Sequence, residues 1–338
     1  MHKREPYDPR KHGISYSKIS DWLGCRQKAA FAAQGVVPVS PSYPLTFGTI
    51  VAEVQQHVHR GIGEGKITKL PGPKRIKRYV SMAEKQWQKE NPKAGQKALE
   101  YLDTSCALAE VIMPEYFKYW KKNLFEMKWD STLTERFHKI PVKVSGHIEV
   151  NINAKMDSAY WLYRKVRSKK DRRKFVKKKS LWLFENKTSS QIVVDKLVET
   201  IPIGLQHGMY MIALEHLFGK LPKGVLYNYI RRPGTYRRKE EPSGEYAQRC
   251  LTDIKKRPEF YFIRIEMVTD KDEVTRVKGE LQGIILEYLK WLDGMREHSV
   301  GSLTHYRNTG ECNGKFGLCP FLPICSRNDY TFFSGGPK

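Results

Sequence analysis

Two carboxylates and one ammonium are spaced so that a β-hairpin would bring them together. Asp157 lies near the end of one β-rich segment, and Glu185, Asn186 and Lys187 end an apolar segment that starts at Leu181. Residues two apart in a strand share a face, so Glu185 and Lys187 would project together. Such carboxylates hold Mg²⁺ or Mn²⁺, which polarises a phosphate and acidifies water, while Lys187 would position that water or neutralise charge. The pattern predicts phosphodiester hydrolysis, with a salt-bridged surface strand as the alternative.

A helix predicted over residues 204–218 carries a second polar pair. Gln206 lies nineteen residues after Lys187, and Tyr210 follows four residues later. Positions i and i+4 share one face of a helix, so both side chains would reach the same place. An ordinary amphipathic helix is the alternative interpretation of these two residues taken alone.

Four of the six cysteines are placed as metal ligands would be. Cys312, Cys319 and Cys325 fall within fourteen residues near the C-terminus, and Cys25 lies at the opposite end of the chain. No secretory signal or membrane span is visible, so a thiol-reducing intracellular compartment is expected. Clustered thiols in such a compartment favour a metal over disulfides. Cys106 and Cys250 show no such pattern and are expected to be buried structural thiols.

The charge of the chain points to a polyanionic partner. Its 338 residues include 60 Lys or Arg and 36 Asp or Glu, for a net charge of +24. With 40% hydrophobic residues the chain can also bury a core, which excludes a purely disordered basic tail. Residues 164–179 hold eleven Lys or Arg and one Asp. This basic run is either a nucleic-acid contact surface or a solvated hairpin tip.

The elements that must position these residues follow an α-then-β order. Residues 15–31 are predicted as one helix with Cys25 inside it, and helices are also expected from 47 and over 81–123. The segments 137–163 and 181–184 are expected to be strands of one sheet. The expected organisation is one integrated domain, with a mainly helical region over 1–130, a core over 131–300 and a cysteine-bearing tail over 301–338.

In this order the motifs resemble the RecB-like branch of the PD-(D/E)XK nuclease superfamily over about residues 14–326. Asp157 matches the family aspartate, residues 185–187 match the E-x-K element, and Gln206 and Tyr210 match the Q-x-x-x-Y helix. The resemblance implies an α/β fold with a restriction-endonuclease-like core, in which a mixed central sheet is flanked by helices. It also implies that Gln206 and Tyr210 bind DNA and order the catalytic residues, and that the Asn186 carbonyl adds a backbone metal ligand.

One family motif is incomplete. Residues 47–53 resemble a G-x-x-x-H-E helix whose His is often a metal ligand, but this chain has Ala52 at that position. His57 and His59 lie on other sides of the helix or two turns away, so neither replaces the missing His. Glu53 is retained and is expected to be an outer metal ligand.

The cysteines extend the resemblance to AddB-like and Cas4-like nucleases, which carry a [4Fe-4S] cluster. Cys25 matches the first cluster ligand, and Cys312, Cys319 and Cys325 match the C-terminal three. The spacing from Cys312 to Cys319 is longer than the usual family spacing. A Zn²⁺ ion bound by four thiolates is the alternative. Either metal would join the N-terminal helix to the C-terminal tail.

Together these features predict a metal-dependent DNA nuclease, a single-strand-preferring exonuclease similar to those of bacteriophages. The expected setting is DNA recombination, repair or replication in the cytoplasm of a bacterial or phage-infected cell, with a recombinase or helicase as a partner. Two alternatives stay open: a catalytically inactive DNA-binding or scaffold protein on the same fold, and an RNA-directed nuclease with the same site.

Overall fold

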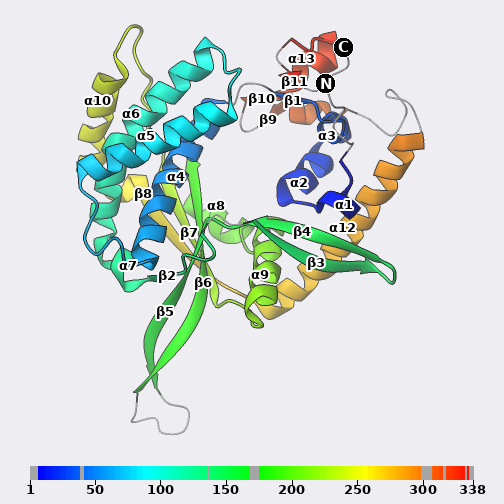
Figure 1. Cartoon of the computed structure of the whole chain (residues 1–338), viewed down its shortest axis with the longest axis horizontal. Helices are drawn as coiled ribbons and strands as arrows, with labels where there is room; N and C mark the ends of the chain where they lie inside the picture. The colour runs from blue at the N-terminus through cyan, green and yellow to red at the C-terminus, as the bar shows by residue number, and fades with distance from the viewer. Residues whose placement is uncertain are drawn as a thin grey trace.

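The protein is built around a five-stranded sheet with helices on both faces (Figure 1). The computed structural model describes residues 7–38, 42–134, 137–167, 175–297, 307–314, 317–331 and 333–334. The helices are α1 (Pro9–His12), α2 (Tyr16–Gly24), α3 (Arg26–Ala33), α4 (Tyr43–Gly63), α5 (Pro73–Glu90), α6 (Gln96–Tyr119), α7 (Lys121–Glu126), α8 (Val194–Thr200), α9 (Leu205–Phe218), α10 (Ser243–Lys256), α11 (Pro258–Tyr261), α12 (Lys271–Glu297), the 3₁₀ turn η1 (Thr309–Cys312) and α13 (Leu322–Arg327). The strands are β1 (Val37–Pro38), β2 (Lys128–Trp129), β3 (Phe137–Ser145), β4 (Ile148–Lys155), β5 (Ser158–Arg167), β6 (Phe175–Ser189), β7 (Gly224–Arg231), β8 (Phe262–Val268), β9 (Asn313–Gly314), β10 (Gly317–Leu318) and β11 (Phe333–Ser334).

The strand order of the main sheet is β2-β5-β6-β7-β8. The pair β6 and β7 is parallel, because α8 and α9 carry the chain back between them, and every other pair is antiparallel. The mixed sheet flanked by helices confirms the predicted α/β class.

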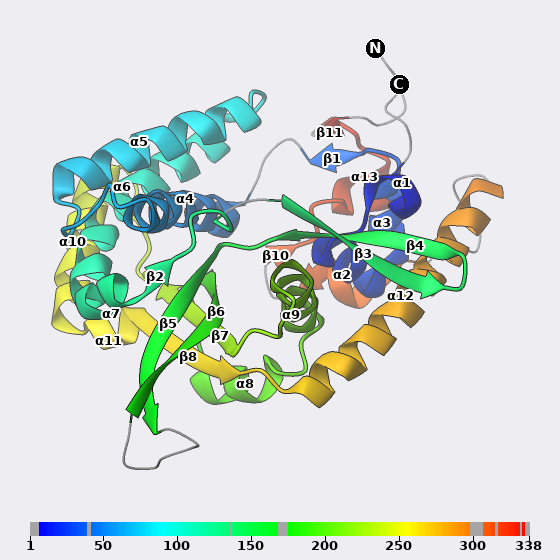
Figure 2. The same cartoon turned by 60° about the horizontal axis from the view of Figure 1, so that its bottom comes forward.

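The two faces of the sheet bury separate cores. Along β6, Trp182 and Phe184 belong to a core shared with α4, α5, α6 and α10. Leu181 and Leu183 project to the other face and belong to a core shared with α2, α9 and α12. Figure 2 shows these two helical layers on either side of the sheet. Glu185 and Lys187 follow Leu181 and Leu183 on the face of β6 that is turned towards α9.

The prediction of one sheet from residue 137 onwards is wrong. β3 and β4 form a separate two-stranded sheet beside α9 and α12. The strand structure is interrupted between β4 and β5, where Met156 is fully buried and Asp157 lies in a bend. The main sheet therefore resumes only at Ser158, directly after Asp157.

The prediction of one helix over 15–31 is also wrong, because α2 ends at Gly24 and Cys25 is extended (φ −154°, ψ 114°). The Gly24 carbonyl accepts a hydrogen bond from the Asn308 side chain at 2.9 Å instead of continuing the helix. Gly24 itself favours a helix end over a helix interior. Cys25 consequently lies at a corner between α2 and α3.

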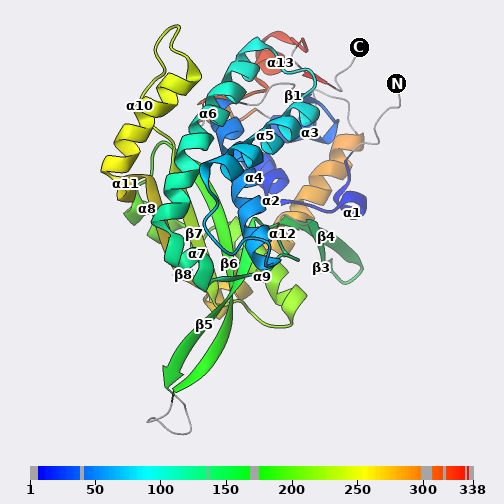
Figure 3. The same cartoon turned by 60° about the vertical axis from the view of Figure 1, so that its left-hand side comes forward.

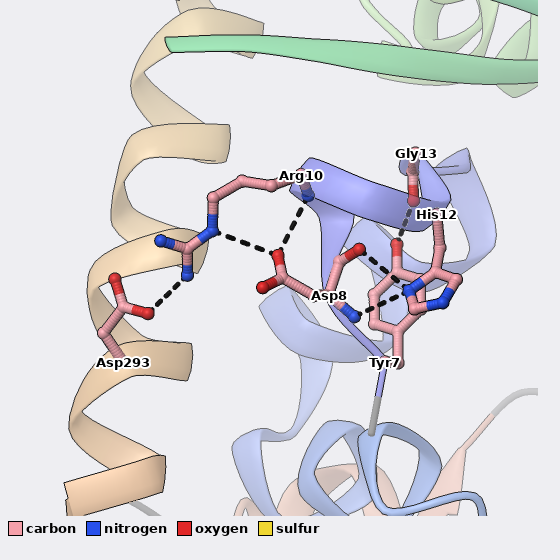
Figure 4. A network of polar contacts seen from close by, with 6 residues as sticks. All are labelled: Tyr7, Asp8, Arg10, His12, Gly13 and Asp293. Carbon is pink, nitrogen blue, oxygen red and sulfur yellow. Dashed lines mark hydrogen bonds and ion pairs between the residues drawn. The ribbon is translucent and has the colours of Figure 1, made fainter. Parts of the chain in front are cut away.

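The N-terminal segment holds β4 in place. Ile14 pairs with this strand, donating to the Asn151 carbonyl at 2.7 Å. The Arg10 guanidinium bonds the carboxylates of Asp8 and Asp293, which ties the segment to α12 (Figure 4). These contacts fix the strand that leads into Asp157.

The strands β5 and β6 extend beyond the rest of the molecule as a two-stranded arm (Figure 3). Their pairing runs from Ser158 opposite Phe184 to Arg167 opposite Phe175. The basic run of 164–179 lies on this arm, although its residues 168–174 are outside the described part of the chain.

A close helix contact beside the candidate site gives a stability prediction. A Cβ atom on Gly208 of α9 would lie 2.4 Å from Val277 Cγ1 of α12, closer than packed carbon atoms approach. We expect Gly208→Ala to lower the free energy of unfolding by about 1–3 kcal/mol in urea denaturation. Gly279→Ala on α12 is the control, since a Cβ there meets nothing within 4 Å. Equal stability of both variants and the wild type would contradict this packing.

Candidate active site and cysteine neighbourhood

The first candidate residue, Asp157, lies at the bend before β5. Ser158, the next residue, pairs with Phe184 of β6, so Asp157 is brought to the strand that carries Glu185. Its carboxylate Oδ2 accepts a hydrogen bond from the Asn186 backbone N–H at 2.7 Å. The predicted hairpin therefore places Asp157 directly against the E-x-K segment.

Glu185 and Lys187 share one face of β6, as the two-residue spacing predicts. The Lys187 ammonium donates to Glu185 Oε1 at 2.6 Å. Glu185 is only 3% exposed, and its second oxygen, Oε2, is buried with no hydrogen-bond partner among the described residues. An unsatisfied buried carboxylate oxygen is costly and calls for a ligand.

The α9 helix supplies the rest of the polar group. Lys187 also donates to Gln206 Oε1 at 3.1 Å, and Gln206 Nε2 donates to the Tyr210 hydroxyl at 3.1 Å. The Tyr210 hydroxyl in turn donates to the Lys155 carbonyl at the end of β4 at 3.3 Å. The structure thus joins five of the predicted residues, Asp157, Glu185, Lys187, Gln206 and Tyr210, into one neighbourhood.

Lys187 is held in its charged form. Burial lowers the pKa of its ammonium, but the nearby carboxylates of Glu185 and Asp157 outweigh that effect and raise the pKa above its ordinary value. Lys187 therefore remains a cation at neutral pH.

Two tyrosines of β7 line this neighbourhood without having been predicted as site residues. Tyr227 and Tyr229 stand opposite Glu185 and Lys187 in the parallel register. Burial raises the pKa of Tyr229, while the adjacent Lys187 lowers it. In the sequence, the alternating Tyr-Asn-Tyr pattern in the strand after the Q-x-x-x-Y helix is the feature that could have predicted these two tyrosines as lining residues.

Glu53 does not lie on the face of α4 that meets the sheet. A Cβ on Gly48 of α4 would meet Thr188 Oγ1 of β6 at 2.9 Å. His59, further along the same helix, contacts the Ser158 hydroxyl of β5 at 3.2 Å. Gly48 and His59 therefore mark the face of α4 that meets the sheet. Ala52 follows Gly48 by about one turn and shares that face, whereas Glu53 is about 140° round the helix from Gly48. The role of Glu53 as an outer metal ligand stays a prediction.

The acidic residues fit a hard divalent cation. Among the described residues, no three His, Cys, Asp or Glu side chains form a group that could hold a metal ion. Mg²⁺ is commonly held by only one or two carboxylates, and waters and substrate phosphates complete its coordination. Asp157 and Glu185 match that type of site, because Glu185 Oε2 meets no hydrogen-bond partner in the part of the chain that the structure describes.

The four candidate cysteines come from both ends of the chain towards one region, where the Asn308 side chain donates to the Gly24 carbonyl and the Cys319 N–H donates to the Cys312 carbonyl at 2.9 Å. Among the described residues, however, these thiols do not form a group of three or more ligands that could hold a metal ion. Burial and then the thiols of Cys319, Cys25 and Cys312 raise the pKa of Cys325 to about 11. All four are free thiols and partly exposed, whereas Cys106 and Cys250 are buried, as predicted.

A small apolar cluster surrounds the cysteine neighbourhood. Phe31 of α3 stacks on Phe321 at 5.7 Å between ring centroids, and Cys319 and Cys325 pack against the same cluster. The short pair β1 and β11 closes the junction between the N-terminal and C-terminal segments.

Two polar cavities flank the sheet. One of about 320 Å³ is lined by Arg60, Lys66, Arg75 and Arg78 at the junction of α4 and α5, with Glu64 already paired to Lys66. A second, of about 230 Å³, lies at the end of β6 and is lined in part by Thr188, Ser189, Ser190 and Arg232.

The family model of the PD-(D/E)XK nuclease superfamily matches residues 13–326. The chain belongs to the PD-(D/E)XK nuclease superfamily, whose membership implies nuclease-type activity on DNA and the use of Mg²⁺ or Mn²⁺. A search of curated proteins found no match. No helix in the described part of the chain is long and apolar enough to cross a membrane.

Proposed function

We propose that the protein is a metal-dependent DNA nuclease in which Asp157 and Glu185 bind Mg²⁺ or Mn²⁺ and Lys187 assists hydrolysis. The observation that carries this proposal is the buried Glu185 carboxylate: one oxygen accepts from Lys187, and the other has no hydrogen-bond partner within the described ranges of the chain. The Asn186 N–H holds Asp157 beside it at 2.7 Å. The proposal also includes the Asn186 carbonyl as a backbone ligand.

The residues divide the work of hydrolysis between them. A bound divalent cation supplies a Lewis acid and lowers the pKa of a bound water. Lys187, charged at neutral pH, donates hydrogen bonds to the attacked phosphate or its attacking water and stabilises the negative charge that develops. Gln206 fixes Lys187 through its Oε1, and Tyr210 fixes Gln206.

Several basic features support DNA as the substrate. The net charge of +24 favours a polyanion, and the arm formed by β5 and β6 carries basic side chains such as Lys165, Arg167 and Lys177 away from the body. The cavity lined by Arg60, Arg75 and Arg78 lies at the junction of α4 and α5 and adds a second group of cations.

The finer assignment follows the motif order. Single-strand-preferring exonuclease action in recombination, repair or replication, with a recombinase or helicase as partner, is proposed from the likeness to the RecB-like branch. The same likeness carries the [4Fe-4S] proposal at Cys25, Cys312, Cys319 and Cys325. A four-thiolate Zn²⁺ site is the alternative there.

A panel of labelled substrates tests the proposed function. With Mg²⁺ or Mn²⁺ present, linear single-stranded DNA is expected to be degraded fastest, duplex DNA more slowly, and a matched RNA strand least. A circular single strand is expected to survive, because an exonuclease needs an end. Faster cleavage of RNA than of DNA would identify the protein as an RNA-directed nuclease. Cleavage of the circular strand would identify it as an endonuclease. Tight DNA binding without cleavage would favour the catalytically inactive DNA-binding alternative.

A further inference from the structure

A buried asparagine lies behind the candidate active site, on the opposite face of the sheet. Asn228 is at the centre of β7 and is 0% exposed. Its neighbours on that face include the apolar side chains of Phe184, Leu226 and Ile230. A buried amide in such surroundings is costly unless every polar atom is bonded, so its presence requires an explanation.

The bonds of Asn228 fix its orientation. Its Oδ1 accepts from the Tyr116 hydroxyl at 2.9 Å and from Arg264 Nε at 3.1 Å. Arg264 Nη2 also donates to the Tyr116 hydroxyl at 3.0 Å, which locks the two donors together. Since two donors face Oδ1, the amide nitrogen must point the other way. There Nδ2 donates to the side-chain Oδ1 of Asn186 at 3.0 Å.

Asn186 connects this buried group to the reacting side of the sheet. It stands directly opposite Asn228 in the register of β6 and β7, and it lies between Glu185 and Lys187 in sequence. Its side chain points to Asn228, whereas its backbone N–H donates to Asp157 at 2.7 Å. Any rotation of the Asn186 peptide would therefore move Asp157 relative to Glu185.

From this chain of contacts we infer that Asn228 is a positioning residue for the metal-binding carboxylates. This inference rests on the proposed function and adds a residue to it. Tyr116 and Arg264 donate hydrogen bonds to Asn228, and Asn228 donates to the Asn186 side chain. The Asn186 backbone N–H in turn donates to Asp157. Asn228 does not touch the reacting atoms, since it faces the other core. Its effect is to fix the separation of two carboxylates that must share one cation.

The substitution Asn228→Leu tests this role, because leucine keeps the approximate volume and removes the amide. We expect the Mg²⁺ concentration that gives half-maximal cleavage to rise about tenfold or more, as for other residues that orient metal ligands. Without DNA, the rise in Tm that Mn²⁺ causes in the wild type is expected to shrink in this variant. DNA binding in EDTA should change less than twofold.

Two further variants separate positioning from mere stability. Ile112→Val trims a fully buried side chain of α6, the helix that carries Tyr116, and should lower Tm without changing the Mg²⁺ dependence. Asn228→Asp keeps the acceptor for Arg264, and a rotated Asn186 amide can donate to it, so this variant should restore most of the wild-type Mg²⁺ dependence. If Asn228→Leu does not fold, Asn186→Ala removes the same link and carries the same expectation.

The inference is overturned if Asn228→Leu, or Asn186→Ala in its place, shows wild-type Mg²⁺ dependence and a wild-type Mn²⁺ shift in Tm. An Asp variant as impaired as the Leu variant would also contradict the amide link. A wild-type protein that cleaves nothing but still gains Tm with Mn²⁺ would refute the proposed activity, while the Tm comparison would still decide the role of Asn228.

Discussion

Lys187→Ala is expected to slow DNA cleavage about 10²–10³-fold, with DNA binding changed little. The substitution removes the cation that bonds Glu185 Oε1 at 2.6 Å and would face the developing negative charge on the phosphate. Loss of one preorganised electrostatic group from an active site costs a factor of this size in kcat. The rate is measured on labelled single-stranded DNA at saturating Mg²⁺, with binding measured separately in EDTA.

The matched control is Lys139→Ala, which removes an exposed lysine of β3 and the same unit of charge. It should cleave at close to the wild-type rate, because salt-dependent attraction of DNA changes only slightly when one of many cations is lost. If Lys187→Ala and the wild type cleave at the same rate, Asp157, Glu185 and Lys187 are not the catalytic group.

If the proposed iron–sulfur cluster is bound, Cys325→Ser is expected to remove it and loosen the junction between the two ends of the chain. Anaerobically purified wild type should be brown with about four irons per chain, as a [4Fe-4S] cluster requires. The variant should lose iron and have a lower Tm, because the apolar cluster around Phe31, Val36, Phe321 and Ile324 is too small to hold the tail alone. Faster tryptic cleavage after Arg327 is the expected sign of this loosening.

Cys106→Ala is the control for this experiment, since Cys106 is a buried thiol in the helical core and away from the cysteine neighbourhood. It should keep its iron and colour. A colourless wild type with one zinc ion would reassign the cysteines to a zinc site without touching Glu185 or Lys187. Unchanged iron in Cys325→Ser would remove Cys325 from the ligand set.

The candidate site was predictable because the relative positions of its residues follow from short spacings in the sequence. A strand alternates its faces, so the positions of Glu185 and Lys187 follow from their two-residue spacing. The helical spacing of Gln206 and Tyr210 is equally local. The structure confirms that these side chains meet, with Lys187 donating to both Glu185 and Gln206.

The features that escaped prediction depend on distant partners. The α2 helix ends at Gly24, whose carbonyl accepts a hydrogen bond from Asn308, 284 residues away in the sequence. The β3 and β4 pair leaves the main sheet because tertiary packing, rather than strand propensity, selects strand neighbours. The sequence shows Asn228 only as a polar residue in a predicted strand, because its hydrogen-bond partners Tyr116 and Arg264 are distant in the sequence.

The measurement that tests the central claim most directly is the metal dependence of cleavage by the wild type. Labelled linear single-stranded DNA is incubated with protein stripped of divalent metal by EDTA, and Mg²⁺ or Mn²⁺ is then added back in excess. A carboxylate-metal site at Asp157 and Glu185 predicts no cleavage in EDTA and full cleavage once either ion is restored. Cleavage that persists in EDTA, or DNA that stays intact with every divalent ion although the protein binds it, would contradict the proposed nuclease site.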